Sequence, residues 1–163
     1  MRTLLKISDA CFLAVAATFS AAFFVCVLIQ VFYRYVLEAP LPWTEELARY
    51  LFVWAAMLAA AVSVGRNDQF SIPLLADALP ARWRHALEYV VVVLALGFAL
   101  VMVWYGWAMA ARLMIAVSPV LPVSQGLIYL VIPIAGGYMA IHLTWRLAAL
   151  ATGRLAAKDG PPW

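Results

Sequence analysis

The sequence predicts an all-α integral membrane protein with four transmembrane helices plus a short amphipathic interfacial helix. Hydrophobic residues make up 67% of the 163 residues and charged residues only 12%, whereas a soluble domain is roughly half apolar and a quarter charged. A chain of this size cannot bury that much apolar surface in a core of its own. The excess must therefore face lipid, and four long apolar stretches supply the helices.

Each of the four stretches is long enough to cross a bilayer, which takes about 20 apolar residues. They fall at about residues 10–33, 45–64, 86–112 and 127–150. Because no repeat or low-complexity linker separates them, we expect a single four-helix transmembrane domain over residues 1–163. The first stretch follows Arg2 and Lys6 as in a signal peptide. It exceeds the roughly 7–15 apolar residues of a signal and is interpreted as a retained helix.

The interfacial helix is expected at about residues 71–80, between the second and third stretches. Apolar and charged side chains mix there, Pro73 suits the first turn of a helix, and Pro80 would end it. A short amphipathic helix of this kind lies in the plane of the membrane surface.

Small residues and one proline shape the expected helix packing. Ala55, Ala59 and Ser63 recur every four residues, as do Ala56 and Ala60, and such faces let helices approach closely in lipid. In the fourth stretch, Pro133 is followed by two glycines and predicts a bend.

Positive charge is distributed unevenly between the two sides of the predicted membrane domain. Eight of the 11 Lys and Arg residues fall in the N-terminal tail, the second loop and the C-terminal end, and three fall on the opposite side. The positive-inside rule then places both termini in the cytoplasm. The net charge of +3 is too small and too scattered for nucleic-acid binding.

The start of the second stretch holds the most informative polar residues. Thr44 is the expected N-cap, and Glu45 and Glu46 fall in the first turn, where carboxylates favour the positive end of the helix dipole. Arg49 follows Glu45 by four residues and Glu46 by three, so the three side chains can meet on one helix face.

Two interpretations of these charges remain open on the residues alone. In the functional one, Arg34, Trp43, Glu45, Glu46 and Arg49 form a docking cluster at one membrane edge. In the other, they form a capped helix start with a surface ion pair that contributes little.

The interiors of the predicted helices hold almost no ionisable side chains. His142 in the fourth stretch is the main exception and is interpreted as a packing residue. A self-sufficient ion carrier usually keeps a charge within the membrane. We find no metal-ligand spacing, phosphate loop or nucleophile–base pair, so no catalytic residue, metal or cofactor is expected, and the chain is not expected to be an enzyme.

Several motifs resemble the DctQ-type small membrane subunit of tripartite ATP-independent periplasmic (TRAP) transporters. The most specific is the stretch from Trp43 to Trp54, which follows Arg34-Tyr35-Val36-Leu37. Weaker matches are the segment 72–82, the Ser-Pro-Val-Leu loop at 118–121 and Tyr-Leu-Val-Ile-Pro-Ile at 129–134. The chain departs from the family pattern at Ala59–Ala61, Gln69-Phe70 and Leu121-Pro122.

The resemblance implies a scaffolding subunit in a bacterial inner membrane. Its expected partners are a large TRAP membrane subunit, which moves an organic acid driven by a sodium or other ion gradient, and a periplasmic substrate-binding protein that delivers it. The outer loops are expected to contact the binding protein.

Two other functions stay open on the residues. A self-contained small oligomeric transporter would move substrate without a partner, and the scarcity of intramembrane charge argues against it. A haem-bearing membrane-anchor subunit of a redox enzyme would use His142, but the second histidine, His85, lies in the loop region.

Overall fold

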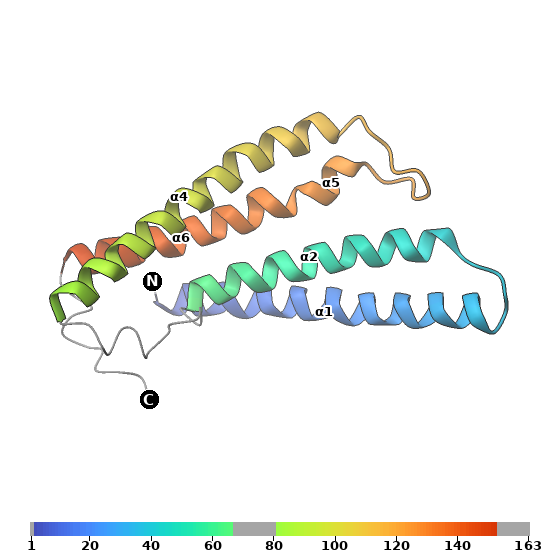
Figure 1. The fold of residues 1–163 in the computed structure, drawn as a ribbon, viewed down its shortest axis with the longest axis horizontal. Helices are drawn as coiled ribbons and strands as arrows, with labels where there is room; N and C mark the ends of the chain where they lie inside the picture. Colours follow the sequence, from blue (N-terminus) through green and yellow to red (C-terminus); the bar gives the residue numbers. More distant parts are fainter. Residues whose placement is uncertain (1, 67–80, 153–163) are drawn as a thin grey trace.

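The computed structural model describes residues 2–66 and 81–152 and is dominated by helices. They are α1 (Arg2–Tyr35), α2 (Pro42–Arg66), α4 (Ala81–Leu113), the short α5 (Gln125–Tyr129) and α6 (Val131–Ala151) (Figure 1). In this described part, four spans are long and apolar enough to cross a membrane, the last of them made of α5 and α6 together. The predicted fold class is confirmed. The expected interfacial helix at 71–80 lies outside the described residues.

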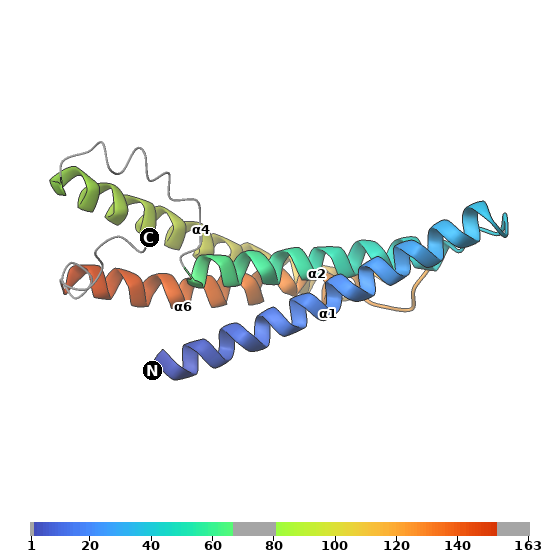
Figure 2. The ribbon, with the colours of Figure 1, turned by 90° about the horizontal axis from the view of Figure 1, so that it is seen from below.

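The helices form two hairpins that pack side by side rather than a closed bundle. α1 packs against α2, α2 against α6, and α6 against α4, so the lateral order is α1, α2, α6, α4. Figure 1 shows the start of α1 and the end of α6 at one end, here called the terminal end. Residues 36–41 and 114–124 turn at the opposite end, here called the hairpin end. Figure 2 shows that α1 crosses α2 obliquely.

Small residues allow α4 and α6 to approach closely. A Cβ atom built on Gly136 would lie 2.9 Å from Met102 Cβ and 3.0 Å from the carbonyl oxygen of Ala99. Ala99 and Ala135 are fully buried. Close backbone approach of this kind stabilises helix pairs in lipid, where the hydrophobic effect between helices is absent.

The small-residue face expected on α2 is only partly correct. Ala55 is buried, but Ala59 is exposed, and the other buried small residues of this helix are Ala48 and Ala61. The helix is packed on two sides, by α1 and by α6. Ala56 and Ala60 are exposed as well, so the two contact faces do not follow a strict four-residue repeat.

The fourth predicted helix is divided at Leu130, which confirms the bend predicted from Pro133. Backbone hydrogen bonds join Leu130 N–H to the Gly126 carbonyl at 3.1 Å and Ile134 N–H to the Leu130 carbonyl at 3.3 Å. Proline has no N–H to donate to the carbonyl of Tyr129, four residues earlier, so the helix breaks there. Figure 1 shows α5 inclined to α6.

Candidate functional site

The start of α2 differs from the predicted N-cap arrangement. The helix begins at Pro42, whose fixed φ and missing N–H suit the first helical position. Thr44 therefore lies inside the first turn, fully buried, and its hydroxyl donates to the Leu41 carbonyl at 2.7 Å. The expectation that Thr44 caps the helix is wrong, because the proline starts the helix two residues earlier.

Glu46 ties the start of α2 to the loop between α4 and α5. Its Oε1 accepts hydrogen bonds from the hydroxyls of Tyr50, at 2.5 Å, and Ser118. Its Oε2 accepts from the backbone N–H groups of Val120, at 3.2 Å, and Leu121, at 3.1 Å. One carboxylate therefore satisfies four donors and joins residues more than 70 positions apart.

The loop that Glu46 holds has an internal frame of its own. Val117 and Ser124 form an isolated antiparallel bridge, and Ser118 N–H donates to the Val123 carbonyl at 3.0 Å. The Ser118 side chain is buried against α2. The sequence singles out the Ser118–Leu121 stretch as a family motif, but without any sign that its serine and backbone amides meet Glu46.

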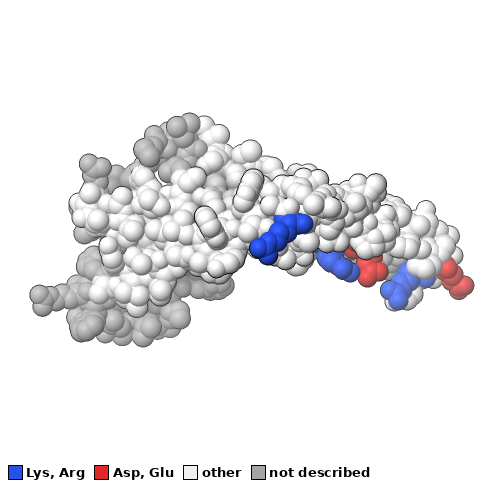
Figure 3. All heavy atoms as spheres, turned by 90° about the horizontal axis from the view of Figure 1, so that it is seen from above, with Lys and Arg blue, Asp and Glu red and all other residues white. Residues whose placement is uncertain are grey.

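The remaining members of the predicted cluster separate from Glu46. Glu45 and Arg49 form an ion pair at 3.9 Å, with side chains 62% and 70% exposed. Trp43 is also exposed. Arg34, at the end of α1, lies 6.0 Å from the ring of Tyr35 and faces a cavity shared with Glu45. On the face shown in Figure 3, charged side chains gather toward the hairpin end.

A second group of polar residues lies toward the terminal end, where α1 meets α6. The Tyr138 hydroxyl of α6 donates to the Asp9 carboxylate of α1, and His142 Nε2 lies 3.5 Å from Asp9 Oδ1. The His142 and Asp9 side chains are only 10% and 14% exposed. The ring of Phe12 stacks on Tyr138 with centroids 4.3 Å apart.

These contacts place ionisable side chains near the ends of the candidate spans. Asp9 is the third residue of the span Ile7–Tyr35, because α1 begins before the first apolar stretch. A second ion pair joins Glu88 of α4 to Arg146 of α6 at 2.8 Å. His142 packs against Tyr138, with ring centroids 4.5 Å apart, and against the backbone of Gly65.

Both polar groups join separate elements of the fold. Across residues 2–66 and 81–152, no group of three His, Cys, Asp or Glu side chains could hold a metal ion. The Glu46 carboxylate is occupied by four donors, and the terminal-end group is shared between helices. The fold and these sites define a small helical membrane protein whose polar residues join helices and loops.

The family follows from comparison with known proteins. Residues 23–153 match the family described as tripartite ATP-independent periplasmic transporters, DctQ component. The chain belongs to this family, which comprises transporter membrane subunits and is not a family of enzymes. It is therefore a small membrane subunit of a TRAP transporter and a multi-pass protein of the inner membrane.

Three relatives illustrate how the match is distributed. The isethionate TRAP transporter permease protein DctMQ of Oleidesulfovibrio alaskensis is 29% identical over 75% of this chain, which corresponds to 20% of the relative. A TRAP transporter small permease protein of Haemophilus influenzae is 28% identical over 76% of each chain. The sialic acid TRAP transporter small permease protein SiaQ of Vibrio cholerae is 34% identical over 36% of this chain and 34% of its own.

Proposed function

We propose that this chain scaffolds a large transport subunit during ion-gradient-driven uptake of an organic acid that a periplasmic binding protein delivers. The relatives support the substrate class, because their names give isethionate and sialic acid. The DctMQ relative is about five times longer than the matched segment and is named a permease protein, which supports a large partner.

The observation that carries the scaffolding role is the low burial of the outer helices. In the most apolar 18-residue segment of α1, only 11% of the residues are buried within the chain, and the same holds for α4. The corresponding segment of the α5–α6 span is 50% buried. These helices present large apolar side chains such as Phe24, Leu28, Leu94 and Phe98. An open row of helices offers a broad apolar face to a neighbouring membrane protein, and lipid covers the remainder.

The hairpin end is proposed to face the periplasm. The positive-inside count supports this orientation, since the three Arg residues of the less positive side all lie toward that end. A single cysteine at Glu38, in a variant without Cys11 and Cys26, tests it. A membrane-impermeant maleimide should label this cysteine in cells with a permeabilised outer membrane, and labelling only after lysis would reverse the orientation.

Within the predicted docking cluster, the exposed residues are the candidates for contact with partner proteins. Glu46 is occupied by the loop, so its proposed role is to hold that loop in place. Trp43 and Arg49 project from the same helix start and are free to meet the large subunit or the binding protein. Their replacement by Trp43→Ala and Arg49→Gln should weaken complex assembly without unfolding the chain.

Reconstitution in liposomes tests the proposal as a whole. Uptake should require this chain, the large subunit, the binding protein and an ion gradient together. Glu38→Gln is the matched control for the docking variants, because it removes a charge from the same end without an ion pair among the described residues. Substrate flux through this chain alone would instead favour the self-contained transporter.

A further inference from the structure

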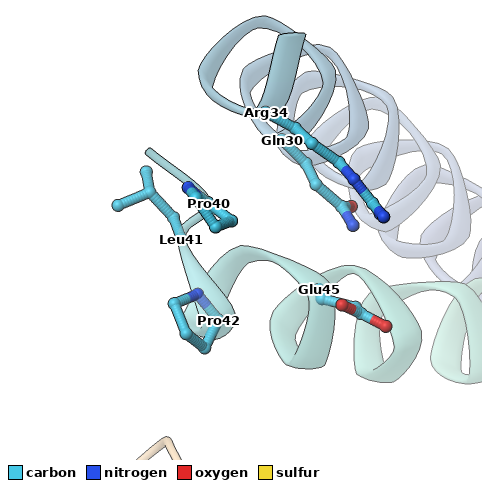
Figure 4. Close-up of a pocket in the computed structure, with 6 residues that line it drawn as sticks. All are labelled: Gln30, Arg34, Pro40, Leu41, Pro42 and Glu45. Carbon is cyan, nitrogen blue, oxygen red and sulfur yellow. The ribbon is translucent and has the colours of Figure 1, made fainter. Parts of the chain in front are cut away.

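A cavity of about 150 Å³ lies between the end of α1 and the start of α2 (Figure 4). Its polar side chains come from both helices, and the turn between them closes one side. The lining residues are Gln30, Arg34, Pro40, Leu41, Pro42 and Glu45. The cavity therefore combines a cation, an amide and a carboxylate in a small volume.

The two charged groups of the cavity are not engaged with each other. Arg34 forms no ion pair with any carboxylate of the described residues, and its guanidinium carbon lies 6.0 Å from the centroid of the Tyr35 ring. Glu45 reaches Arg49 only at 3.9 Å, with most of its side chain exposed. Both groups consequently retain hydrogen-bonding capacity toward a ligand.

The position of the cavity along the helices corresponds to the headgroup level of a bilayer. The first span ends at Tyr35, one residue after Arg34, and the second begins at Pro42, three residues before Glu45. Tyr35 and Trp43, each next in sequence to a lining residue, are exposed, and such amphipathic side chains favour the membrane–water interface. A phospholipid headgroup is the ligand present at this depth in any membrane.

The charges also select among headgroups. An arginine guanidinium binds a phosphate through two parallel hydrogen bonds, and the Gln30 amide can donate a third. A carboxylate accepts hydrogen bonds from a primary ammonium, which a quaternary choline cannot donate. Inorganic phosphate would leave Glu45 unused and repelled, and a glycerol headgroup offers no cation.

The volume of the cavity is that of a few small polar groups and not of a whole phospholipid. At roughly 30 Å³ for each water in the liquid, the cavity has room for about five water molecules. We propose that Arg34, Gln30 and Glu45 form a binding site for the phosphoethanolamine headgroup of a phospholipid in the leaflet at the hairpin end. The site goes beyond the transport role, because it needs neither substrate nor partner subunit.

Native mass spectrometry of the purified full chain measures this binding directly. The chain is titrated with phosphatidylethanolamine, phosphatidylcholine and phosphatidylglycerol of identical acyl chains. We expect phosphatidylethanolamine to bind at least about threefold more tightly than the other two lipids. This ratio corresponds to the binding free energy of one partly exposed charge pair. Equal binding of the three lipids, or displacement of phosphatidylethanolamine by inorganic phosphate, would overturn the site.

Two variants assign the binding to the cavity. Glu45→Gln should remove the preference for phosphatidylethanolamine over phosphatidylcholine, and Arg34→Gln should weaken the binding of all three lipids. Arg112→Gln is the matched control, because it removes an exposed arginine at the end of α4, outside the cavity. If Glu45→Gln still prefers phosphatidylethanolamine, and circular dichroism shows an unchanged helix content, the carboxylate does not recognise the headgroup. Glu45→Asp, with a shorter carboxylate, should keep part of the selectivity if Glu45→Gln is too unstable to purify.

Discussion

Gly126 is the position where one added methyl group should disturb the hairpin end most. A Cβ atom at this residue would lie 2.6 Å from the Ala110 carbonyl oxygen, 2.7 Å from Met114 N and 2.8 Å from Met114 Cα. All three are backbone atoms at the end of α4, so no side-chain rotation can relieve the contact. Gly126→Ala must therefore push α5 away from α4.

The cost follows from the displacement that is needed. Moving the closest pair from 2.6 Å to the 3.4 Å of an ordinary contact takes a shift of about 0.8 Å. Overpacking of this kind typically costs about 1–3 kcal/mol, and sometimes more. Gly137→Ala is the matched control, because its Cβ would meet nothing within 4 Å, and replacing a helical glycine by alanine contributes about 0.5–1 kcal/mol of stability. Both glycines are helical, so this gain is common to the two variants, and we expect them to differ by the overpacking cost of roughly 1–3 kcal/mol.

Reversible unfolding in mixed micelles, followed by circular dichroism, measures the difference in the free energy of unfolding. Gly126→Ala should be less stable than the wild type, and Gly137→Ala equal to it or more stable. If both variants unfold at the wild-type denaturant concentration, α5 does not pack on α4 as closely as described, and the account of this end of the molecule fails.

Three further predictions concern the polar contacts and the α1–α2 turn. Glu46→Gln replaces one carboxylate oxygen by an NH₂ group, which cannot accept a hydrogen bond. The Val120 and Leu121 backbone amides should then exchange hydrogen for deuterium faster, as measured by mass spectrometry, whereas Glu45→Gln should leave their exchange unchanged. Equal exchange in both variants would show that Glu46 does not hold the loop. Tyr138→Phe removes the hydroxyl that donates to Asp9 and should lower the free energy of unfolding by about 0.5–2 kcal/mol in the same assay. If this variant is as stable as the wild type, the hydrogen bond contributes nothing to stability. Glu38 has a φ of 51°, in the left-handed region that favours glycine. Glu38→Gly should therefore stabilise the turn by about 0.5–1 kcal/mol, whereas Glu38→Ala should not. Identical stabilities of the two variants would contradict the claim that the backbone is strained at this residue.

Much of the fold could be predicted because each membrane helix is determined by the residues of its own segment. An apolar stretch of sufficient length has few alternatives to a helix in lipid, where every backbone polar group needs a partner. The bend near Pro133 is local for the same reason, since the missing N–H belongs to that residue. Both features follow from one segment without knowledge of its neighbours.

The partner of each charged side chain could not be predicted in this way. Helical spacing places Glu45, Glu46 and Arg49 within reach of one another, and Glu45 does pair with Arg49. Glu46 instead meets Ser118, because the second hairpin brings a distant loop over the start of α2. That contact depends on how the hairpins pack, and no pattern within α2 carries the information.

Asp9 was missed for a related reason. A hydropathy criterion starts the first span after a charged residue, so it assigns Asp9 to the tail. The structure continues α1 through this position, and Tyr138 and His142 of α6 provide polar contacts for the Asp9 carboxylate. A carboxyl group near the end of a membrane span is tolerated when such partners face it, and the partners lie about 130 residues away.

Purification of the chain from its native host in mild detergent, with identification of what accompanies it by mass spectrometry, tests the central claim most directly. The account predicts that one large multi-helix TRAP permease co-purifies in a constant ratio through successive columns. Recovery of the chain alone, or as a homo-oligomer without that permease, would contradict its role as the scaffold of a larger transport subunit.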